Sequence, residues 1–223
     1  MRMALEFAKR DGAAFISHLD LQRAFSRAIR RSGMPVKLSQ GFNPHYVVSF
    51  ASALALGVPS ECECVEMQLA REVSPEEFLN AMKRALPPGL AAKRAVRLRE
   101  EAPRLMAALD EAEYAAELDA ADLTAVEAAI RDVIAAESVV VTRIVKGAEK
   151  TTDIRPLIAS LILSGNVLTM RLSASQEKSL RPDVALEELK RRAGGFTYRV
   201  SRTALMTFAK GLPGQPLLDA FGE

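Results

Sequence analysis

The sequence predicts an α+β protein made of tandem ferredoxin-like (βαββαβ) modules with antiparallel sheets. In the first 100 residues, the hydrophobic patterns run in the order strand, helix, strand, strand, helix, strand. After Pro103 a similar order returns, which indicates internal duplication. With 223 residues, 49% of them hydrophobic, the chain can bury two cores. We therefore expect an N-terminal module at 1–104, a C-terminal module at 105–210 and a tail at 211–223.

The first strand and helix carry clear local signals. Apolar side chains alternate along Met3–Ala8, which is typical of a half-buried strand. Ser17 is a good N-cap and Asp20 follows three residues later, so a helix is predicted over His18–Arg31. Gly33 ends this helix, and its apolar face should pack on the sheet.

The other elements follow from alternation, helix caps and turn residues. In the first module they are strands at Tyr46–Phe50, Cys64–Leu69 and Ala91–Arg99, and a helix that starts after Ser74 and ends before Pro87. In the second module they are strands at Glu113–Leu118, Ser138–Lys146, Val167–Ser173 and Phe196–Leu205, and helices at Leu123–Ala136 and Val184–Arg192.

Two segments fit this order less simply. An insertion at Gly147–Gly165 contains the apolar run Leu157–Leu163, which reads as another strand of the second sheet. In the tail, Leu217–Phe221 follows a stretch rich in turn formers and is either a short docking segment or loose.

Composition excludes several classes of protein. There are 30 Lys and Arg against 28 Asp and Glu, so no overall field draws the chain to nucleic acid or to an anionic membrane. No apolar run approaches the roughly 18 residues of a membrane span, and two cysteines make no disulfide framework. We expect a protein of the cytoplasm with no membrane association.

Several short motifs carry a resemblance over nearly the whole chain. They are Ser17-His18-Leu19-Asp20, Ser39-Gln40-Gly41-Phe42-Asn43-Pro44-His45, Ser49-Phe50-Ala51, Leu56-Gly57-Val58, Asp153-Ile154-Arg155-Pro156 and Arg202-Thr203-Ala204-Leu205. With these motifs the chain resembles the radical-SAM-linked family, an uncharacterised bacterial domain found beside or fused to a radical SAM protein. The resemblance implies a radical SAM protein as partner.

The chain itself has no sequence motif for radical SAM chemistry. It lacks the three-cysteine CxxxCxxC cluster that holds an iron–sulfur cluster with one open iron. Cys62 and Cys64 would face the same side of a strand and make an incomplete zinc site. We expect no metal and no cofactor in this chain.

Ser39–His45 is the most unusual loop. Gly41 permits a tight turn and Pro44 helps to fix it. The aromatic rings of Phe42 and Tyr46 and the imidazole of His45 are close in sequence to Lys37. Bases of RNA stack on such rings. The alternative is that Phe42 caps the core and the loop only builds a turn. The candidate binding residues are Lys37, Phe42, Asn43, His45 and Tyr46.

His18 and His45 are the only histidines, and such a pair can divide acid and base roles on an RNA phosphodiester. If the second strand starts at Val36 they lie at one end of the sheet; if it starts at Tyr46 they lie at opposite ends. We expect the start at Tyr46. The alternative role for His18 is a hydrogen bond in the first helical turn.

Two basic groups complete the candidates. The outward helix face carries Arg23, Arg27, Arg30 and Arg31, which either meet phosphates or are simply solvated. The polar loop after Val145 carries Lys146, Lys150 and Arg155, without the order of a nucleotide P-loop. Arg155 is expected to point outward beside Pro156, or else an internal ion pair joins Asp153 with Arg155 or a neighbour.

These features support three hypotheses. The first is a non-catalytic accessory protein of a radical SAM enzyme, associated with RNA; the tandem fold suggests RNA by analogy only. The second is a metal-independent endoribonuclease that uses His18 and His45. The third is a protein–protein scaffold that binds no nucleic acid.

Overall fold

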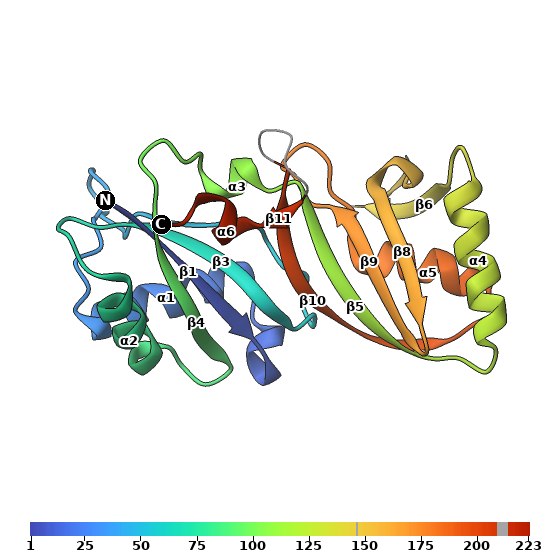
Figure 1. The fold of residues 1–223 in the computed structure, drawn as a ribbon, viewed down its shortest axis with the longest axis horizontal. Coiled ribbons are helices and arrows are strands. Elements are labelled where there is room, and N and C mark those ends of the chain that lie inside the picture. Colours follow the sequence, from blue (N-terminus) through green and yellow to red (C-terminus); the bar gives the residue numbers. More distant parts are fainter. Residues whose placement is uncertain (146, 209–213) are drawn as a thin grey trace. The chain divides into compact units, whose positions relative to one another are not determined.

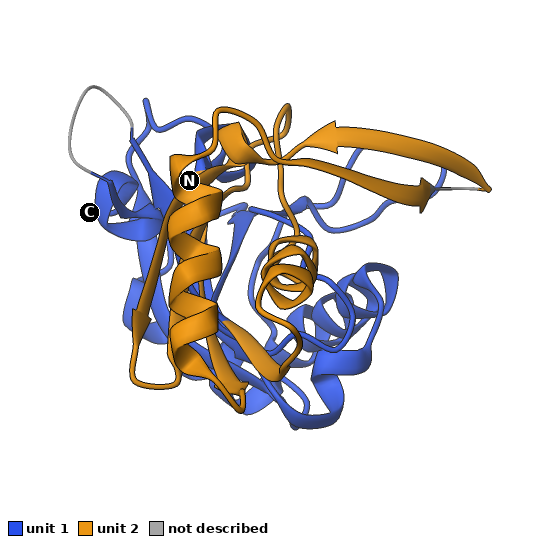
Figure 2. Cartoon of the chain, turned by 90° about the vertical axis from the view of Figure 1, so that its right-hand side faces the viewer, with its two compact units in different colours: residues 1–110, 202–223 blue, residues 111–201 orange. Residues whose placement is uncertain are grey.

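A computed structural model of the chain describes residues 1–145, 147–208 and 214–223. The chain divides into two compact units, one of residues 1–110 with 202–223 and one of residues 111–201 (Figures 1 and 2). Both mix helices with mostly antiparallel strands, which confirms the predicted α+β class. None of the helices in the described ranges combines the length and hydropathy required to cross a membrane.

The first unit repeats the predicted element order and adds short helices to it. Three antiparallel pairings, β4 with β1, β1 with β3 and β3 with β2, give the strand order β4-β1-β3-β2. Its elements are β1 (Arg2–Lys9), η1 (Asp11–Phe15), α1 (His18–Ser32), β2 (Val48–Phe50), β3 (Ser60–Gln68), α2 (Pro75–Ala85), β4 (Leu90–Leu98), α3 (Leu105–Ala108), β11 (Gln215–Pro216) and α6 (Leu217–Phe221).

Local signals set the ends of α1 as predicted. The Ser17 hydroxyl accepts a hydrogen bond from the Asp20 backbone N–H at 3.1 Å, which satisfies one of the free donors of the first turn. Gly33 follows the helix in the left-handed conformation, with φ of 68°. The predicted start at His18 is therefore confirmed, and the helix ends one residue later than expected.

One face of the first sheet packs against α1 and α2. Met3, Leu5 and Phe7 of β1 are completely buried, together with Phe25 of α1 and Phe78 of α2. The rings of Phe7 and Phe25 lie 4.8 Å apart, centroid to centroid. The alternation along β1 thus places its apolar side chains in the core, as the sequence predicts.

The other face of this sheet is also covered. Glu66 of β3 points away from the helical core and accepts a hydrogen bond from the backbone N–H of Leu105 at 3.1 Å. Its carboxylate also pairs with Arg2 at 3.0 Å and with Arg104 at 2.5 Å. These contacts hold α3, a short helix that the sequence pattern does not predict.

The C-terminal segment 214–223 crosses the first unit as a strap. β11 pairs with β10 (Thr197–Thr207), and α6 buries Leu217, Leu218 and Phe221. Beyond α6, the backbone N–H of Glu223 donates to the carbonyl oxygen of Arg97 on β4 at 2.9 Å. Of the two alternatives for the tail, its described part is therefore docked.

The strap borders a hollow that the two cysteines also line. Cys62 and Cys64 line a hollow of about 390 Å³ together with Leu217 of α6. Burial raises the pKa of Cys62 to about 12 and that of Cys64 well above its usual range. Because the thiolate is the nucleophile, both thiols should be inert while the strap is docked.

We expect Leu217→Asp to undock the strap and speed the reaction of the thiols with a disulfide reagent at pH 8 at least tenfold. Leu217 is 1% exposed, so a carboxylate there would have to reach water by displacing α6. The control is Leu56→Asp, the same change at a side chain that is 66% exposed. Equal labelling rates in wild type and Leu217→Asp would show that the strap does not protect the thiols.

The second unit has the same strand order with an insertion. β9 pairs antiparallel with both β5 and β8, while β10 lies next to β5. Its elements are β5 (Glu111–Asp119), α4 (Leu123–Ala135), β6 (Val140–Val145), β7 (Ala148–Asp153), η2 (Arg155–Leu157), β8 (Ile158–Ser164), β9 (Val167–Ser173) and α5 (Pro182–Arg192). β10 begins in this unit and ends in the first.

The segment predicted as a strand at Ser138–Lys146 does form a strand, β6, but it does not join the main sheet, so its expected place in the repeated order is wrong. Its described part, β6, pairs only with β7 in a separate two-stranded ribbon. β8 takes the place beside β9 instead, because the apolar residues of Ile158–Ser164 suit a half-buried strand. The predicted extra strand at Leu157–Leu163 therefore corresponds to β8.

Candidate nucleic-acid and partner interface

The loop Ser39–His45 is closed at its neck by hydrogen bonds. The Ser39 backbone N–H donates to the His45 carbonyl oxygen at 2.7 Å. The Ser39 hydroxyl accepts from the His45 backbone N–H at 3.1 Å and lies 2.9 Å from the Nδ1 of the His45 ring. At the turn, Gly41 has a φ of 132°, a conformation that favours glycine. These hydrogen bonds fix the conformation of the loop.

This loop presents its aromatic residue to solvent. The relative exposure of Phe42 is 106%, so the ring makes almost no contact with the rest of the described chain. Phe42 therefore does not cap the core, and that alternative is wrong. Lys37, Asn43 and His45 are also exposed, whereas Tyr46 is half-buried against the core of the first unit.

The basic face of α1 separates into two kinds of arginine. Arg31 donates to the carbonyl oxygen of Ala85 at the end of α2 at 2.6 Å, so it ties two helices together. Arg23 pairs with Asp20 at 3.1 Å. Arg27 and Arg30 are exposed, and neither side chain has a hydrogen bond or ion pair within the described part of the chain. These two are the arginines available to a phosphate.

The two histidines have separate surroundings. The rings of His18 and Phe50 lie edge to face with their centroids 5.3 Å apart, and the Nε2 of His18 lies 3.2 Å from the amide nitrogen of Gln22. His45 precedes β2, whereas Phe50 is the last residue of β2. The intervening chain spans about 15 Å if extended. A general acid and a general base must both contact the same substrate. None of the contacts described for His18 or His45 brings the two rings together.

Among the candidate basic residues of the second unit, Arg155 holds the backbone in place with its guanidinium. Its guanidinium donates to the carbonyl oxygens of Ile134 at 3.0 Å and Ile158 at 3.0 Å, so the expectation that it points outward is wrong. Asp153 instead accepts hydrogen bonds from two backbone N–H groups, which lower its pKa. Lys150 is exposed on β7, and Lys146 lies outside the described residues.

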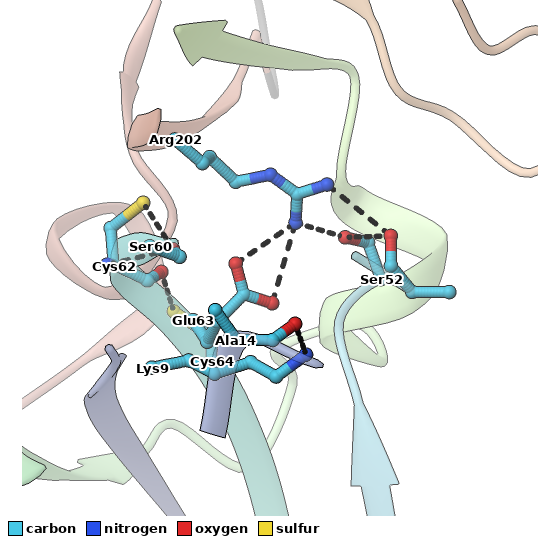
Figure 3. A network of polar contacts seen from close by, with 9 residues as sticks. Lys9, Ala14, Ser52, Ser60, Cys62, Glu63, Cys64 and Arg202 are labelled. Carbon is cyan, nitrogen blue, oxygen red and sulfur yellow. Dashed lines mark hydrogen bonds and ion pairs between the residues drawn. The ribbon is translucent and has the colours of Figure 1, made fainter. Parts of the chain in front are cut away.

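A buried network of charges was not predicted as a site. Arg202 and Glu63 are 3% and 2% exposed, and their side chains pair at 3.0 Å (Figure 3). Arg202 also donates to the Ser52 hydroxyl at 2.6 Å and to the Ala53 carbonyl oxygen at 3.2 Å. It therefore fixes the loop between β2 and β3.

Lys9 extends this network to the start of α1. Its ammonium donates to the carbonyl oxygen of Ala14 at 3.3 Å (Figure 3). It also donates to the carbonyl oxygen of Ile16 at 3.2 Å. Burial lowers the pKa of Lys9, and the negative charge of Glu63 opposes that shift. Because every charge is enclosed and partnered, the network suits positioning rather than reaction with a substrate.

The sequence does contain a signal for these buried charges. Lys9 lies in register with Met3, Leu5 and Phe7 on the apolar face of β1, and Glu63 lies in register with Val65 on β3. A charge at such a position is either buried with a partner or ends the strand. Only the tertiary structure shows the partners: Arg202 of β10 pairs with Glu63, whereas Lys9 is held by backbone carbonyl oxygens and by the negative charge of Glu63.

The described features define an α+β protein with a presented loop, exposed cations and an enclosed charge network. Its described residues contain no group of three or more His, Cys, Asp or Glu side chains arranged to hold a metal ion. A family model, DUF2344, described as uncharacterized protein conserved in bacteria, matches residues 2–182. The chain therefore belongs to this bacterial family. No curated protein matches the chain.

Proposed function

We propose that this chain is a non-catalytic accessory protein of a radical SAM enzyme, and that it associates with RNA through α1 and the Ser39–His45 loop. The radical SAM partner rests on the family resemblance carried by the motifs. The repeated strand order supports two ferredoxin-like modules. With its sheet covered on both faces, the first module would use its loop and helix to contact RNA.

The observation that carries the RNA proposal is Phe42, exposed at the tip of a hydrogen-bonded loop. An exposed aromatic ring in a fixed frame is suited to stacking with an unpaired base, since every base has a π-face. Lys37 and Arg30 are exposed close to this loop in the sequence and would supply phosphate contacts. The separate histidines favour binding over cleavage.

We expect Phe42→Ala to weaken binding of a fluorescent tRNA pool by about five- to 150-fold, since a base–aromatic stack contributes about 1–3 kcal/mol. The salt dependence should not change, because phenylalanine makes no ionic contact. Fluorescence anisotropy over a salt series measures both quantities. Arg27→Glu/Arg30→Glu should, in contrast, reduce the salt dependence.

The matched control is Phe15→Ala, which removes an aromatic side chain that is 71% exposed on η1. It should bind RNA as wild type does. An unchanged affinity in Phe42→Ala would refute the stacking role. Absence of binding even at low salt would exclude RNA association, and co-purification with a co-expressed radical SAM protein would then support the scaffold hypothesis.

A further inference from the structure

The ribbon of β6 and β7 stands outside the main sheet of the second unit. Its two strands pair from Val140 with Asp153 to Val145 with Ala148, and the ribbon projects from that unit (Figure 2). The base is anchored, because Asp153 accepts from the backbone N–H of Val139 at 2.8 Å. A two-stranded hairpin alone is only marginally stable in water.

The two faces of the ribbon differ in charge. Side chains alternate along a strand, so Ile144 and Glu149 oppose each other on one face. On the other face, Arg143 lies directly opposite Lys150. Neither cation has an ion pair within the described residues. Like charges directly opposite each other destabilise a strand pair, and this ribbon has no third strand to offset that cost.

We propose that the Arg143–Lys150 face is a phosphate-binding site and that the ribbon is an arm that holds the phosphodiester backbone of single-stranded RNA. Directly opposite residues have Cβ atoms about 5 Å apart, so both cations can reach one phosphate group. Arginine binds phosphate oxygens in bidentate fashion, and lysine adds a point charge. A bound phosphate would convert the repulsion into attraction. This inference rests on the proposed RNA association and adds a second contact element to it.

Arg143→Glu separates a binding role from a structural one. The new carboxylate would face Lys150 and form a cross-strand ion pair, so the ribbon should be as stable as in wild type or more stable. The phosphate site, however, would be lost. A purely structural role for Arg143 would make ribbon stability and RNA affinity change in the same direction, whereas a phosphate site makes them diverge.

The experiment titrates a fluorescein-labelled 15-mer of uridine into the full chain over a salt series. For Arg143→Glu we expect at least tenfold weaker binding at 50 mM salt and a salt slope reduced by about 0.7, the value for one phosphate group on a single strand. Arg131→Glu, at an exposed position on α4, changes the net charge equally and should leave the slope unchanged. Equal effects of the two variants would overturn the proposal.

A second readout separates this inference from the proposed function. Inorganic pyrophosphate should shift the backbone NMR signals of residues 141–143 and 150–152 in wild type and not in Arg143→Glu. Such shifts without oligouridine binding would support the phosphate site and refute the RNA association. Oligouridine binding that depends on Phe42, with no pyrophosphate shifts and no effect of Arg143→Glu, would refute the arm alone.

Discussion

Arg202→Ala is expected to destabilise the chain by about 3–5 kcal/mol, the usual cost of removing one partner from a buried ion pair. The Glu63 carboxyl group would remain at 2% exposure without the guanidinium 3.0 Å away. The Ser52 hydroxyl and Ala53 carbonyl would lose their donor as well. Urea unfolding followed by circular dichroism measures the loss.

Arg199 on the same strand is a matched control. It pairs with Glu117 at the same distance, 3.0 Å, but its side chain is 88% exposed. Because exposed ion pairs contribute little, Arg199→Ala should cost less than about 1 kcal/mol. Arg202→Lys should recover only part of the stability, since an ammonium lacks the planar fork of guanidinium. A similar loss in both alanine variants would contradict the buried-pair argument.

Gly89→Ala should also cause a large loss of stability, about 2–4 kcal/mol. Gly89 has a φ of +82°, which is unfavourable for alanine. A Cβ atom there would lie 2.8 Å from the Cβ of Ala13 and 2.9 Å from the carbonyl oxygen of Arg10. Both atoms belong to the segment around η1, so either this segment or the turn before β4 must move.

Gly33 provides the control, because it shares the positive φ but not the crowding. Its φ is +68°, and a Cβ atom there would meet nothing within 4 Å. Gly33→Ala should therefore show only the conformational cost, about 1 kcal/mol. Parallel urea unfolding of the two variants gives the comparison. If both lost the same free energy, close packing at Gly89 would make no contribution.

The network and the turn at Gly89 act on the same part of the first unit. Lys9 holds the carbonyl groups on either side of Phe15, and Gly89 packs against Ala13 of η1. The backbone N–H of Arg10 donates to the Gly89 carbonyl oxygen at 2.8 Å. Both variants should therefore loosen η1 and the start of α1, which hydrogen exchange of these amides would detect.

The sequence by itself determined the elements whose signals are local. Ser17 and Gly33 bound α1, because a capping side chain and a left-handed residue act within one helical turn. The strand predicted at Val167–Ser173 agrees with β9 at both ends. Alternation also predicted which side chains of β1 enter the core. Such patterns depend on neighbouring residues and need no knowledge of partners.

Only the tertiary structure decided which strands and side chains meet. β6 has an extended pattern like that of β8, yet it pairs with β7 outside the main sheet, because strand pairing depends on distant segments. Arg155 binds backbone carbonyls, whereas Phe42 stands free in solvent. Both residues looked like candidates for binding. The sequence gives each side chain its chemistry, but its exposure and its partners are set by long-range packing.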